Sequence, residues 1–482
     1  MREGNFLCEI KELIYTEAPI KRIVSSLPEN CIDIIKVRMS RAIENIIDEI
    51  IDQYLYADET NRPWIIGFSG GKDSTVLLQL VWIGLDRIKE KNPADLKRDV
   101  YVVCNDTMVE NPIVTEYVFR VLDQIEVAAR DQGMPIFVKK TIPRLEDSFW
   151  VNLIGRGYPA PNNAFRWCTE RLKIKPTSRF ILEQLDISSE AIILIGTREA
   201  ESATRAKSMK KHEVKGKRLS AHPMHKNTFI YSPIRKLATE EVWYVINTMP
   251  PPWRTDNSEL SQIYADAQAD DYECPTMVSD KQHKSCGQSR FGCWVCTVVT
   301  QDKSMSALIK NGQNWLIPLL KLRNEIAEER NLTESRMPTR RNGQIAKDGL
   351  GCYSPEYRAS VLKRLLEAQK EVQKTKPYLE LITNQELIAI QVIWYRDLIF
   401  DPKVSSIYDK IFDEAFDMKN QDEKLRKELE LLRQSCDGDE DNFELIKGLL
   451  VLQKNKSLLN RKRGLNDDIE TKIEEHLKKA KK

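Results

Sequence analysis

Residues 64–74 read WIIGFSGGKDS, and this stretch decides the fold. Its apolar start predicts a buried strand, and from Asp73 to about Lys91 apolar residues recur on one helical face. A strand, a glycine loop and a helix in this order place backbone N–H groups at a helix N-terminus, where they cradle phosphate. The loop supplies two glycines, a cation and two hydroxyls, from Gly70, Gly71, Lys72, Ser69 and Ser74. The stretch therefore predicts a phosphate-binding loop.

This loop is not of the Walker type. That motif requires G-x-x-x-x-G-K-[ST], whereas its first glycine would fall here at Ile66, and Asp73 follows Lys72 in place of Ser or Thr. SGGKDS resembles instead the pyrophosphate loop of the N-type ATP pyrophosphatases, which cleave ATP between the α- and β-phosphates. An ordinary strand-to-helix turn is the alternative.

Strands and helices alternate from residue 64 to about residue 250. Short apolar and β-branched runs predict strands at 64–68, 100–104, 136–139 and 191–196, with helical stretches between them. The alternation predicts an α/β fold in which a parallel sheet carries helices on both faces. Ligands of such sheets bind beyond the carboxyl ends of the strands. The glycine loop lies at that edge, and so does Asp106, which follows the second predicted strand.

Composition divides the chain into four regions. We expect a helical region at 1–60, where isoleucines recur at helical spacing, and the α/β domain at 61–250. Residues 251–355 are rich in Pro, Cys, Gly and Arg, and residues 356–482 are charged and helical in pattern. The chain of 482 residues is long enough for several domains with their own cores.

Charge and hydropathy narrow the class of protein. The net charge is +2, so only local patches can indicate an acidic partner. No apolar run approaches the roughly 20 residues of a membrane span, and the N-terminal MREGNFLCEIKELIY lacks the apolar stretch of a signal peptide. We therefore expect a cytoplasmic protein without a membrane partner. Its ten cysteines are then expected to serve metal or redox chemistry rather than disulfides.

Four of these cysteines fall within 23 residues: Cys274, Cys286, Cys293 and Cys296. Four thiolates at such spacing suit zinc or an iron–sulfur cluster, and the spacing alone does not choose the metal. The apolar neighbours Trp294 and Val295 favour a redox cluster, which a dry wall tunes. Reduced cysteines without a metal are the alternative. Cys352 is the substitute if Cys274 is not a ligand.

Cys168 stands apart in the string FRWCTERLKIKP. Basic residues surround it at Arg166, Arg171, Lys173, Lys175 and Arg179. Nearby cations lower the pKa of a thiol, which suits a nucleophile or a persulfide carrier. A buried cysteine among basic residues that face a substrate phosphate is an equal alternative.

Further basic residues follow the fourth predicted strand. Arg198 and Arg205 are candidate forked donors to phosphate oxygens, and surface ion pairs with neighbouring glutamates are the alternative. Residues 205–226, here called the basic segment, contain eight Lys or Arg and a single acid. Such a density can contact a nucleic-acid backbone without reading its sequence, or simply form a solvated loop.

Five strings together resemble the phosphoadenosine phosphosulfate reductase family: SGGKDS, CNDT, FRWCTERLKIKP, IGTREAESATR and YSPIRKLATEEVWYVI. The strings GFSGGKDSTVLLQLVW and CGQSRFGCWVCTVVTQDKS resemble, within that family, the DndC-type sulfurtransferases of bacterial DNA phosphorothioation. The resemblance implies an adenine nucleotide α-hydrolase-like fold and an enzyme that cleaves ATP to AMP and pyrophosphate. It also implies a 4Fe–4S cluster and replacement of a non-bridging oxygen of the DNA backbone by sulfur. A cysteine desulfurase would donate the sulfur, and sibling Dnd proteins would be partners.

The resemblance assigns chemistry to individual residues. Residues 69–74 would stabilise the departing pyrophosphate, with Mg²⁺. Asp73 would hold that metal or cap the helix, and Asp106 would bind ribose or metal. A sulfur nucleophile, from a Cys168 persulfide or a cluster-bound sulfide, would then displace AMP.

Three other functions stay open. The first is a sulfonucleotide reductase, although the chain lacks the C-terminal cysteine beside glycine and histidine that such reductases carry. The second is a non-catalytic iron–sulfur DNA-binding subunit, against which the intact Lys72 and Asp73 argue. The third is a tRNA thiolase, since nothing in the sequence separates RNA from DNA.

Overall fold

The structure is a computed structural model. It describes residues 29–56, 61–201, 206–207, 209–210, 217–267, 292–341, 344–346, 348–397, 399, 401–413, 430–436, 439, 442–443, 445–446 and 449. Within these ranges, every helix is too short or too polar to cross a membrane.

The chain divides into two compact units. Unit 1 comprises Met1–Ile142 and Asn162–Arg323, and unit 2 comprises Pro143–Pro161 and Asn324–Lys482. The units therefore interleave along the sequence. Composition predicts four consecutive regions instead, and it does not reveal that a short piece of the α/β region belongs with the C-terminal part.

Unit 1 is built on a six-stranded sheet with the strand order β3-β2-β1-β4-β6-β5. All neighbouring strands pair in parallel except β5, which is antiparallel to β6. The strands are β1 (Trp64–Gly67), β2 (Val100–Asn105), β3 (Ile136–Thr141), β4 (Ala191–Leu194), β5 (Ser220–Ala221) and β6 (Thr228–Tyr231). The four strands predicted from the sequence are confirmed to within two residues at each end. The sequence-based prediction omits β5, which has only two residues, and β6, whose run Thr228–Tyr231 is as short as β1 and β4.

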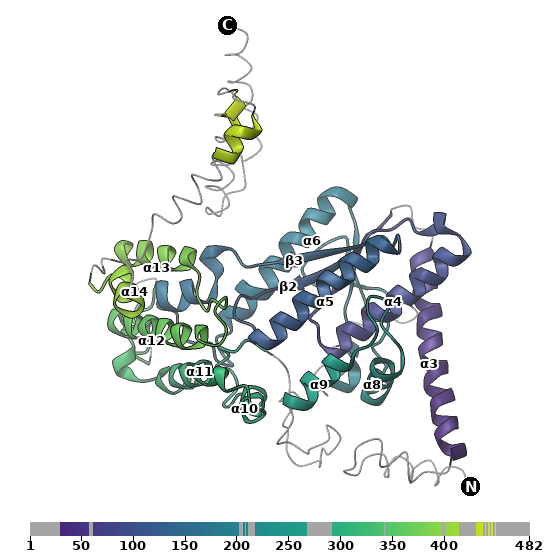
Figure 1. The fold of residues 1–482 in the computed structure, drawn as a ribbon, viewed down its shortest axis with the longest axis horizontal. Helices are drawn as coiled ribbons and strands as arrows, with labels where there is room; N and C mark the ends of the chain where they lie inside the picture. The colour runs from purple at the N-terminus through teal and green to yellow at the C-terminus, as the bar shows by residue number, and fades with distance from the viewer. Residues whose placement is uncertain are drawn as a thin grey trace. The chain divides into compact units, whose positions relative to one another are not determined.

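Helices cover both faces of the sheet, as the sequence predicts. One face carries α3 (Glu29–Leu55), α4 (Lys72–Lys91), α5 (Pro112–Asp131) and α8 (Thr239–Thr248). The other face carries α6 (Lys175–Ser188). Alternate residues of β1 explain both layers, because Trp64 and Ile66 join the first core and Ile65 joins the second. Figure 1 shows α5 along β2 and β3 and α3 beside α4.

The isoleucine stripe of the N-terminal region is a core-facing side in α3. Ile43, Ile47 and Ile50 are all buried in the main core. Helix α4 meets this stripe at Gly84, where a Cβ would stand 3.2 Å from Ile50 Cγ2. The missing side chain therefore allows the two helices to pack closely. Residues 1–28 of this region lie outside the described residues.

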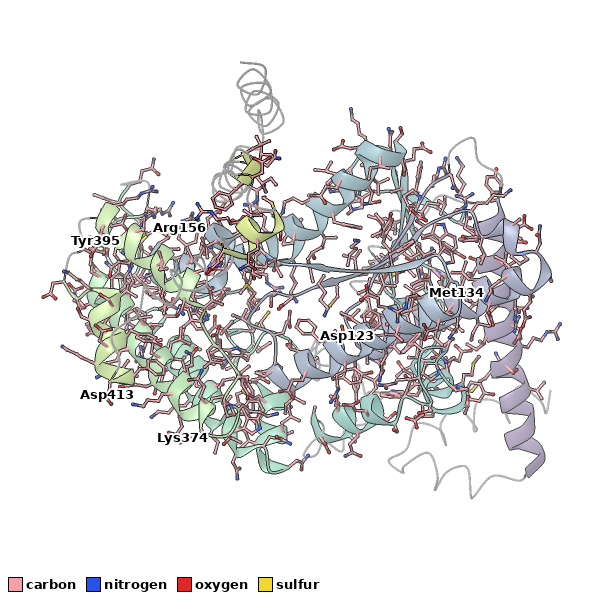
Figure 2. The ribbon with its side chains drawn as sticks, turned by 45° about the horizontal axis from the view of Figure 1, so that its top comes forward. Asp123, Met134, Arg156, Lys374, Tyr395 and Asp413 are labelled. Atoms are coloured by element: carbon pink, nitrogen blue, oxygen red, sulfur yellow. The ribbon has the colours of Figure 1, made fainter. Side chains whose placement is uncertain are left out.

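Further helices and short helical turns belong to unit 1. They are η1 (Pro93–Asp95), η4 (Thr169–Ile174), η5 (Glu199–Glu201), α9 (Ser258–Ala267), α10 (Lys303–Lys310) and η6 (Asn314–Leu316). Helix α11 (Ile317–Glu329) continues from unit 1 into unit 2. Figure 2 shows Asp123 on α5 and Met134 just beyond the end of that helix.

The described part of unit 2 is helical, as the sequence predicts. Its elements are η2 (Leu145–Asp147), η3 (Val151–Gly155), η7 (Thr333–Ser335), α12 (Pro355–Gln373), α13 (Asn384–Arg396) and α14 (Val404–Phe412). Tryptophan N–H groups hold the inserted piece in place, since Trp150 donates to the Leu381 carbonyl (2.7 Å) and Trp394 to the Ile154 carbonyl (3.0 Å). Figure 2 labels Arg156, Lys374, Tyr395 and Asp413 in this unit.

Candidate active site

The candidate site lies at the carboxyl edge of the sheet in unit 1. Strand β1 has β2 on one side and β4 on the other, so the chain leaves β1 at the point where the strand order reverses. Ligands of open α/β sheets bind at such switch points. The loop Phe68–Ser74, called the phosphate loop below, joins β1 to α4 at this point.

The phosphate loop is a tight turn in which two backbone N–H groups donate hydrogen bonds to serine hydroxyls of the same loop. The Ser69 N–H donates to Ser74 Oγ (3.2 Å), and the Gly71 N–H donates to Ser69 Oγ (3.5 Å). Ser74 Oγ also donates to the Gly71 carbonyl at 3.0 Å. The N-cap of α4 is Gly71, so Asp73 lies in the first helical turn and is not the cap. These donors surround the N-terminus of a 20-residue helix, whose dipole favours an anion.

Gly70 is required in this loop for two independent reasons. Its φ of +71° lies in the left-handed region, which side chains disfavour. A Cβ at this position would also stand 2.2 Å from Val118 Cγ2 of α5. The loop therefore packs directly on α5, and any side chain at Gly70 forces the two apart.

Arg198 joins the loop after β4 to the phosphate loop. Its Nε donates to Asp73 Oδ1 (2.7 Å), and its Nη1 donates to the Leu237 carbonyl (3.0 Å). Arg198 is only 1% exposed, so the guanidinium holds Asp73 from inside the protein. The other oxygen of Asp73 lies 3.3 Å from Lys72 Nζ. The neighbouring Glu199 pairs with Arg235 instead, and contact of Arg198 with phosphate stays a prediction.

Tyr264 of α9 contacts the phosphate loop, and sequence reasoning misses it. The Lys72 N–H donates to the Tyr264 hydroxyl (3.3 Å), and Lys72 Nζ lies 5.4 Å from the centre of the ring. Tyr264 lies 192 residues from Lys72 and belongs to no motif. Only the tertiary position of α9 brings it here.

Asp106 lies at the end of β2, on the same edge as the phosphate loop. Its Oδ1 accepts the Met108 N–H at 2.7 Å, which closes a turn. Burial raises the pKa of the Asp106 carboxyl above its ordinary value, and the charge of Glu110 raises it further, while the Met108 N–H lowers it. The structure thus places Asp106 at the predicted edge, and its predicted contact with ribose or metal is untested.

The C-x-x-C turn of Cys293 and Cys296 docks on the chain that follows β2. Glu110 and Cys293 form an isolated antiparallel bridge, and the Trp294 N–H donates to the Val109 carbonyl at 3.0 Å. The Cys293 thiol lies 3.5 Å from Thr107 Oγ1 and 3.7 Å from Glu110 Oε1. The two cysteines therefore sit at the carboxyl end of β2, the strand next to β1.

Arg323 fixes the chain just after this turn. Its Nε donates to the Cys296 carbonyl (2.8 Å) and its Nη1 to the Thr300 carbonyl (2.9 Å), and it also contacts the Val299 carbonyl. Arg323 is buried, and α11 supplies it. One arginine thus satisfies several carbonyls of the irregular chain that presents the thiols.

Cys168 joins the same group of thiols. Burial raises the pKa of the Cys168 thiol, and the nearby Cys296 raises it further, although hydrogen bonds of Thr169 lower it. The sequence-based expectation that the basic neighbours lower this pKa is therefore wrong, because burial outweighs the other effects. The π-helical turn η4, which follows Cys168, carries Lys173, whose Nζ lies 3.3 Å from Glu110 Oε1. The fold thus brings Cys168 close enough to Cys296 for the two thiols to interact electrostatically, which the sequence does not predict.

Several predicted site residues lie outside the described residues. Cys274, Cys286 and Arg205 belong to this group. Among the residues that the structure does describe, no group of three or more His, Cys, Asp and Glu side chains is arranged to hold a metal ion. The charge of Cys296 raises the pKa of the thiols of both Cys168 and Cys293, and thiols are the donors that an iron–sulfur cluster takes, so the predicted cluster stays a prediction. Cys352 belongs to unit 2, and its thiol pKa is raised by burial.

Residues 63–298 match the family model of the phosphoadenosine phosphosulfate reductase domain. An uncharacterized protein of Methanocaldococcus jannaschii is 28% identical over 260 residues. That match covers 51% of this chain and 44% of the relative, so it spans less than half of the relative's length.

Two solved structures are distant neighbours. The phosphoadenylyl-sulfate reductase of Candida auris, in a phosphate complex, has a TM-score of 0.27 and 12% identity, and the match covers 49% of this chain and 93% of that one. The U34-tRNA thiolase NcsA of Methanococcus maripaludis, with its 4Fe–4S cluster, has a TM-score of 0.25 and 17% identity, with 48% and 74% covered. The family match covers the whole sheet, the phosphate loop and the C-x-x-C turn. Residues 63–298 of this chain therefore have an α/β fold like that of the phosphoadenosine phosphosulfate reductase domain.

Proposed function

We propose that this protein is an ATP-dependent sulfurtransferase that modifies the DNA backbone to a phosphorothioate. One observation carries the proposal. The phosphate loop follows β1, and the thiols of Cys293 and Cys296 dock on the chain after the neighbouring strand β2, with Cys168 near Cys296. Activation of a phosphate and delivery of sulfur require these two functions side by side.

ATP activates the target in the first step. A non-bridging oxygen of the DNA phosphate attacks the α-phosphorus of ATP, and the bond to the β-phosphate breaks with release of pyrophosphate. The N–H groups and hydroxyls of the phosphate loop stabilise the charge that develops on pyrophosphate, together with Lys72 and Mg²⁺. Asp73 pairs with Arg198 through one carboxylate oxygen and with Lys72 through the other. Its second oxygen therefore holds Lys72 in place and can also face the metal.

Sulfur replaces the activated oxygen in the second step. A sulfur nucleophile forms a P–S bond, and AMP leaves with the original oxygen. Where Cys168 carries the sulfur as a persulfide, a second thiol then forms a disulfide with Cys168 and releases the phosphorothioate. A bound 4Fe–4S cluster would instead supply the sulfur as sulfide. A cysteine desulfurase loads the sulfur, and sibling Dnd proteins handle the DNA.

The basic segment supports DNA as the target. It starts just after η5, which follows β4, and it runs into β5. Because β5 is antiparallel to β6 and Ser220 pairs with Ile230, the segment returns to the carboxyl edge of the parallel strands. Ser220 therefore lies near the edge that carries the phosphate loop, whereas the end of the segment at Lys226 follows β5 toward the opposite edge. Of its charges, Arg218 pairs with the exposed Asp52 of α3 at 3.2 Å.

Mass spectrometry of genomic DNA tests the proposal. Nuclease digests from cells that express this protein with its partners are expected to contain phosphorothioate dinucleotides, and digests from cells that lack it are not. Complementation with Lys72→Ala is expected to leave the DNA unmodified, and complementation with Tyr378→Phe to restore modification, since Tyr378 is 99% exposed. Unmodified DNA with every variant, or sulfur found in tRNA instead, would refute the DNA assignment.

The family match favours a second candidate, reduction of a sulfonucleotide. Such a reductase releases sulfite from phosphoadenosine phosphosulfate and needs no ATP cleavage. Sulfite release from that substrate, without pyrophosphate release from ATP, would select this candidate.

A further inference from the structure

Tyr264 reaches the phosphate loop at both its backbone and its lysine. The hydroxyl accepts the Lys72 N–H at 3.3 Å, and the ring lies beneath Lys72 Nζ, 5.4 Å from its centre. A Cβ at Gly71 would stand 3.2 Å from the same hydroxyl. The tyrosine oxygen therefore occupies the space directly in front of the helix N-terminus.

The hydroxyl of Tyr264 accepts a backbone N–H of the loop, as the hydroxyls of Ser69 and Ser74 do. Three backbone N–H groups, those of Ser69, Gly71 and Lys72, end on the hydroxyl oxygens of Ser74, Ser69 and Tyr264. A hydroxyl accepts and donates, so it can turn its proton toward a phosphate oxygen that takes over the N–H. Tyr264 is placed to act on the same anion as Ser69 and Ser74.

Packing holds Tyr264 in this position independently of the loop. Its ring makes an edge contact with Trp243 of α8, with the ring centres 5.3 Å apart. Helix α9 buries Leu260 and Ile263 in the main core. Glu259 ties the start of α9 to Arg254 at 3.7 Å and contacts Arg120 of α5. Figure 1 shows α9 next to α8 and close to α4. A hydroxyl that is already ordered loses little entropy when it binds.

We propose that Tyr264 is a third hydroxyl ligand of the pyrophosphate group of ATP and that its ring positions the Lys72 ammonium. This inference rests on the proposed ATP cleavage and adds a residue from outside the glycine motif. The ligand class is the pyrophosphate part of a nucleoside triphosphate. A cation over the face of an aromatic ring is attracted to it, so the ring holds Lys72 near the phosphates.

Titration calorimetry on the full chain tests this role with three ligands: magnesium pyrophosphate, α,β-methylene ATP and AMP. Tyr264→Phe keeps the ring and the Trp243 contact but removes the hydroxyl. The affinity for pyrophosphate and for the ATP analogue is expected to fall about 10-fold or more, since hydrogen bonds to charged groups are the strong ones. The affinity for AMP, which lacks pyrophosphate, is expected to stay unchanged. Tyr264→Leu is expected to lose more, because the ring beneath Lys72 is also gone.

The outcomes separate this inference from the proposed function. Pyrophosphate binding by Tyr264→Phe that equals or exceeds the wild-type affinity would overturn it, because the hydroxyl would then only fill a vacant N–H. An equal loss of AMP affinity would overturn it too, since that loss indicates structural damage. Tyr378→Phe is the control and is expected to bind all three ligands normally. A wild-type chain that binds neither pyrophosphate nor the analogue would refute the ATP site itself, and this inference with it.

Discussion

Arg198 and Lys72 share the carboxylate of Asp73, and they hold it in different ways. Arg198 is buried and bonds Asp73 at 2.7 Å, whereas Lys72 is partly exposed at 3.3 Å. Gly196 lets the loop after β4 approach, since a Cβ there would stand 3.0 Å from the Asp73 carbonyl. Arg198 therefore supports the loop, and Lys72 is the cation that stays available for an anion.

Arg198→Met is expected to lower the free energy of unfolding by about 2 kcal/mol or more. The change leaves the Asp73 carboxylate and the buried Leu237 carbonyl without their donor, and uncompensated polar groups of this kind are costly. Urea denaturation measures the loss. Arg235→Met is the control, because its pair with Glu199 is partly exposed and is expected to contribute less than about 1 kcal/mol. Equal losses in the two variants would contradict the supporting role of Arg198.

Single residues show where sequence reasoning ends. The glycines, Lys72 and the serines of the phosphate loop act within one short motif, so their place can be read from the chain. The partner of Arg198 lies 125 residues away, and that of Tyr264 lies 192 residues away. Both pairs depend on how separate elements dock, and no local pattern carries that information.

At the scale of elements, the phosphate loop is shaped by its contact with α5. Gly70→Ala is expected to reduce ATP cleavage about 100-fold, since a displaced loop loses its alignment with the phosphates. The reason is the 2.2 Å approach to Val118, in addition to the positive φ. Pyrophosphate release measures the effect.

Gly133→Ala is the matched control for this change. Gly133 also has a positive φ, +60°, but a Cβ there would meet nothing within 4 Å. The control is expected to cost about 1 kcal/mol of stability and to leave ATP cleavage intact. Comparable cleavage by Gly70→Ala and Gly133→Ala would show that the contact with α5 does not shape the site.

The C-x-x-C turn docks on the chain after β2 and presents Cys293 and Cys296, and we expect these thiols to hold a metal centre. Anaerobically purified protein is expected to be brown, with about four irons per chain. Cys293→Ser and Cys296→Ser are each expected to bleach it, and Cys436→Ser, in the helical part after residue 429, is expected to keep the colour. Iron analysis and the visible spectrum provide the measurement. A colourless protein with about one zinc would rule out the cluster.

The elements themselves are largely predictable from the sequence. Strands β1, β2 and β4 are apolar, β3 begins with an apolar and β-branched run, and helix α4 has a clear apolar face, so their sequences identify them. Strand β5 has only two residues, so it gives no local signal, whereas the β6 sequence TFIY favours a strand and is as short as β1. Cys168 comes near Cys296 only through the folding of the chain. The sequence therefore suggests a role for Cys168 but not its place beside the C-x-x-C turn.

At the scale of the whole molecule, the two units alternate along the chain, so each is built from two separate stretches of sequence. Residues 143–161 join unit 2 because Trp150 and Ile154 form hydrogen bonds with residues more than 200 positions further along the chain. Composition describes neighbours in sequence, so it cannot show such an exchange. The net charge of +2 likewise conceals the concentration of charge in the basic segment.

Neutralising several lysines of the basic segment is expected to weaken binding to all DNA sequences alike. Each phosphate contact that is lost reduces the slope of log Kd against log salt concentration for duplex DNA by about 0.9. Fluorescence anisotropy at several salt concentrations measures both effects. ATP cleavage without DNA is expected to survive, because the phosphate loop contains none of these residues. Unchanged affinity and salt slope would assign the segment to an ordinary solvated loop.

Identification of the products of ATP, with and without DNA, tests the role of the phosphate loop most directly. The wild-type chain is expected to yield AMP and pyrophosphate in equal amounts, and a DNA substrate is expected to consume the activated intermediate and raise turnover. Lys72→Ala is expected to cleave ATP about 100-fold or more slowly, the usual effect of removing one charged group that faces developing charge. Release of ADP and phosphate, or a folded Lys72→Ala protein that cleaves ATP like the wild type, would contradict the assignment of this edge of the sheet as an ATP pyrophosphatase site.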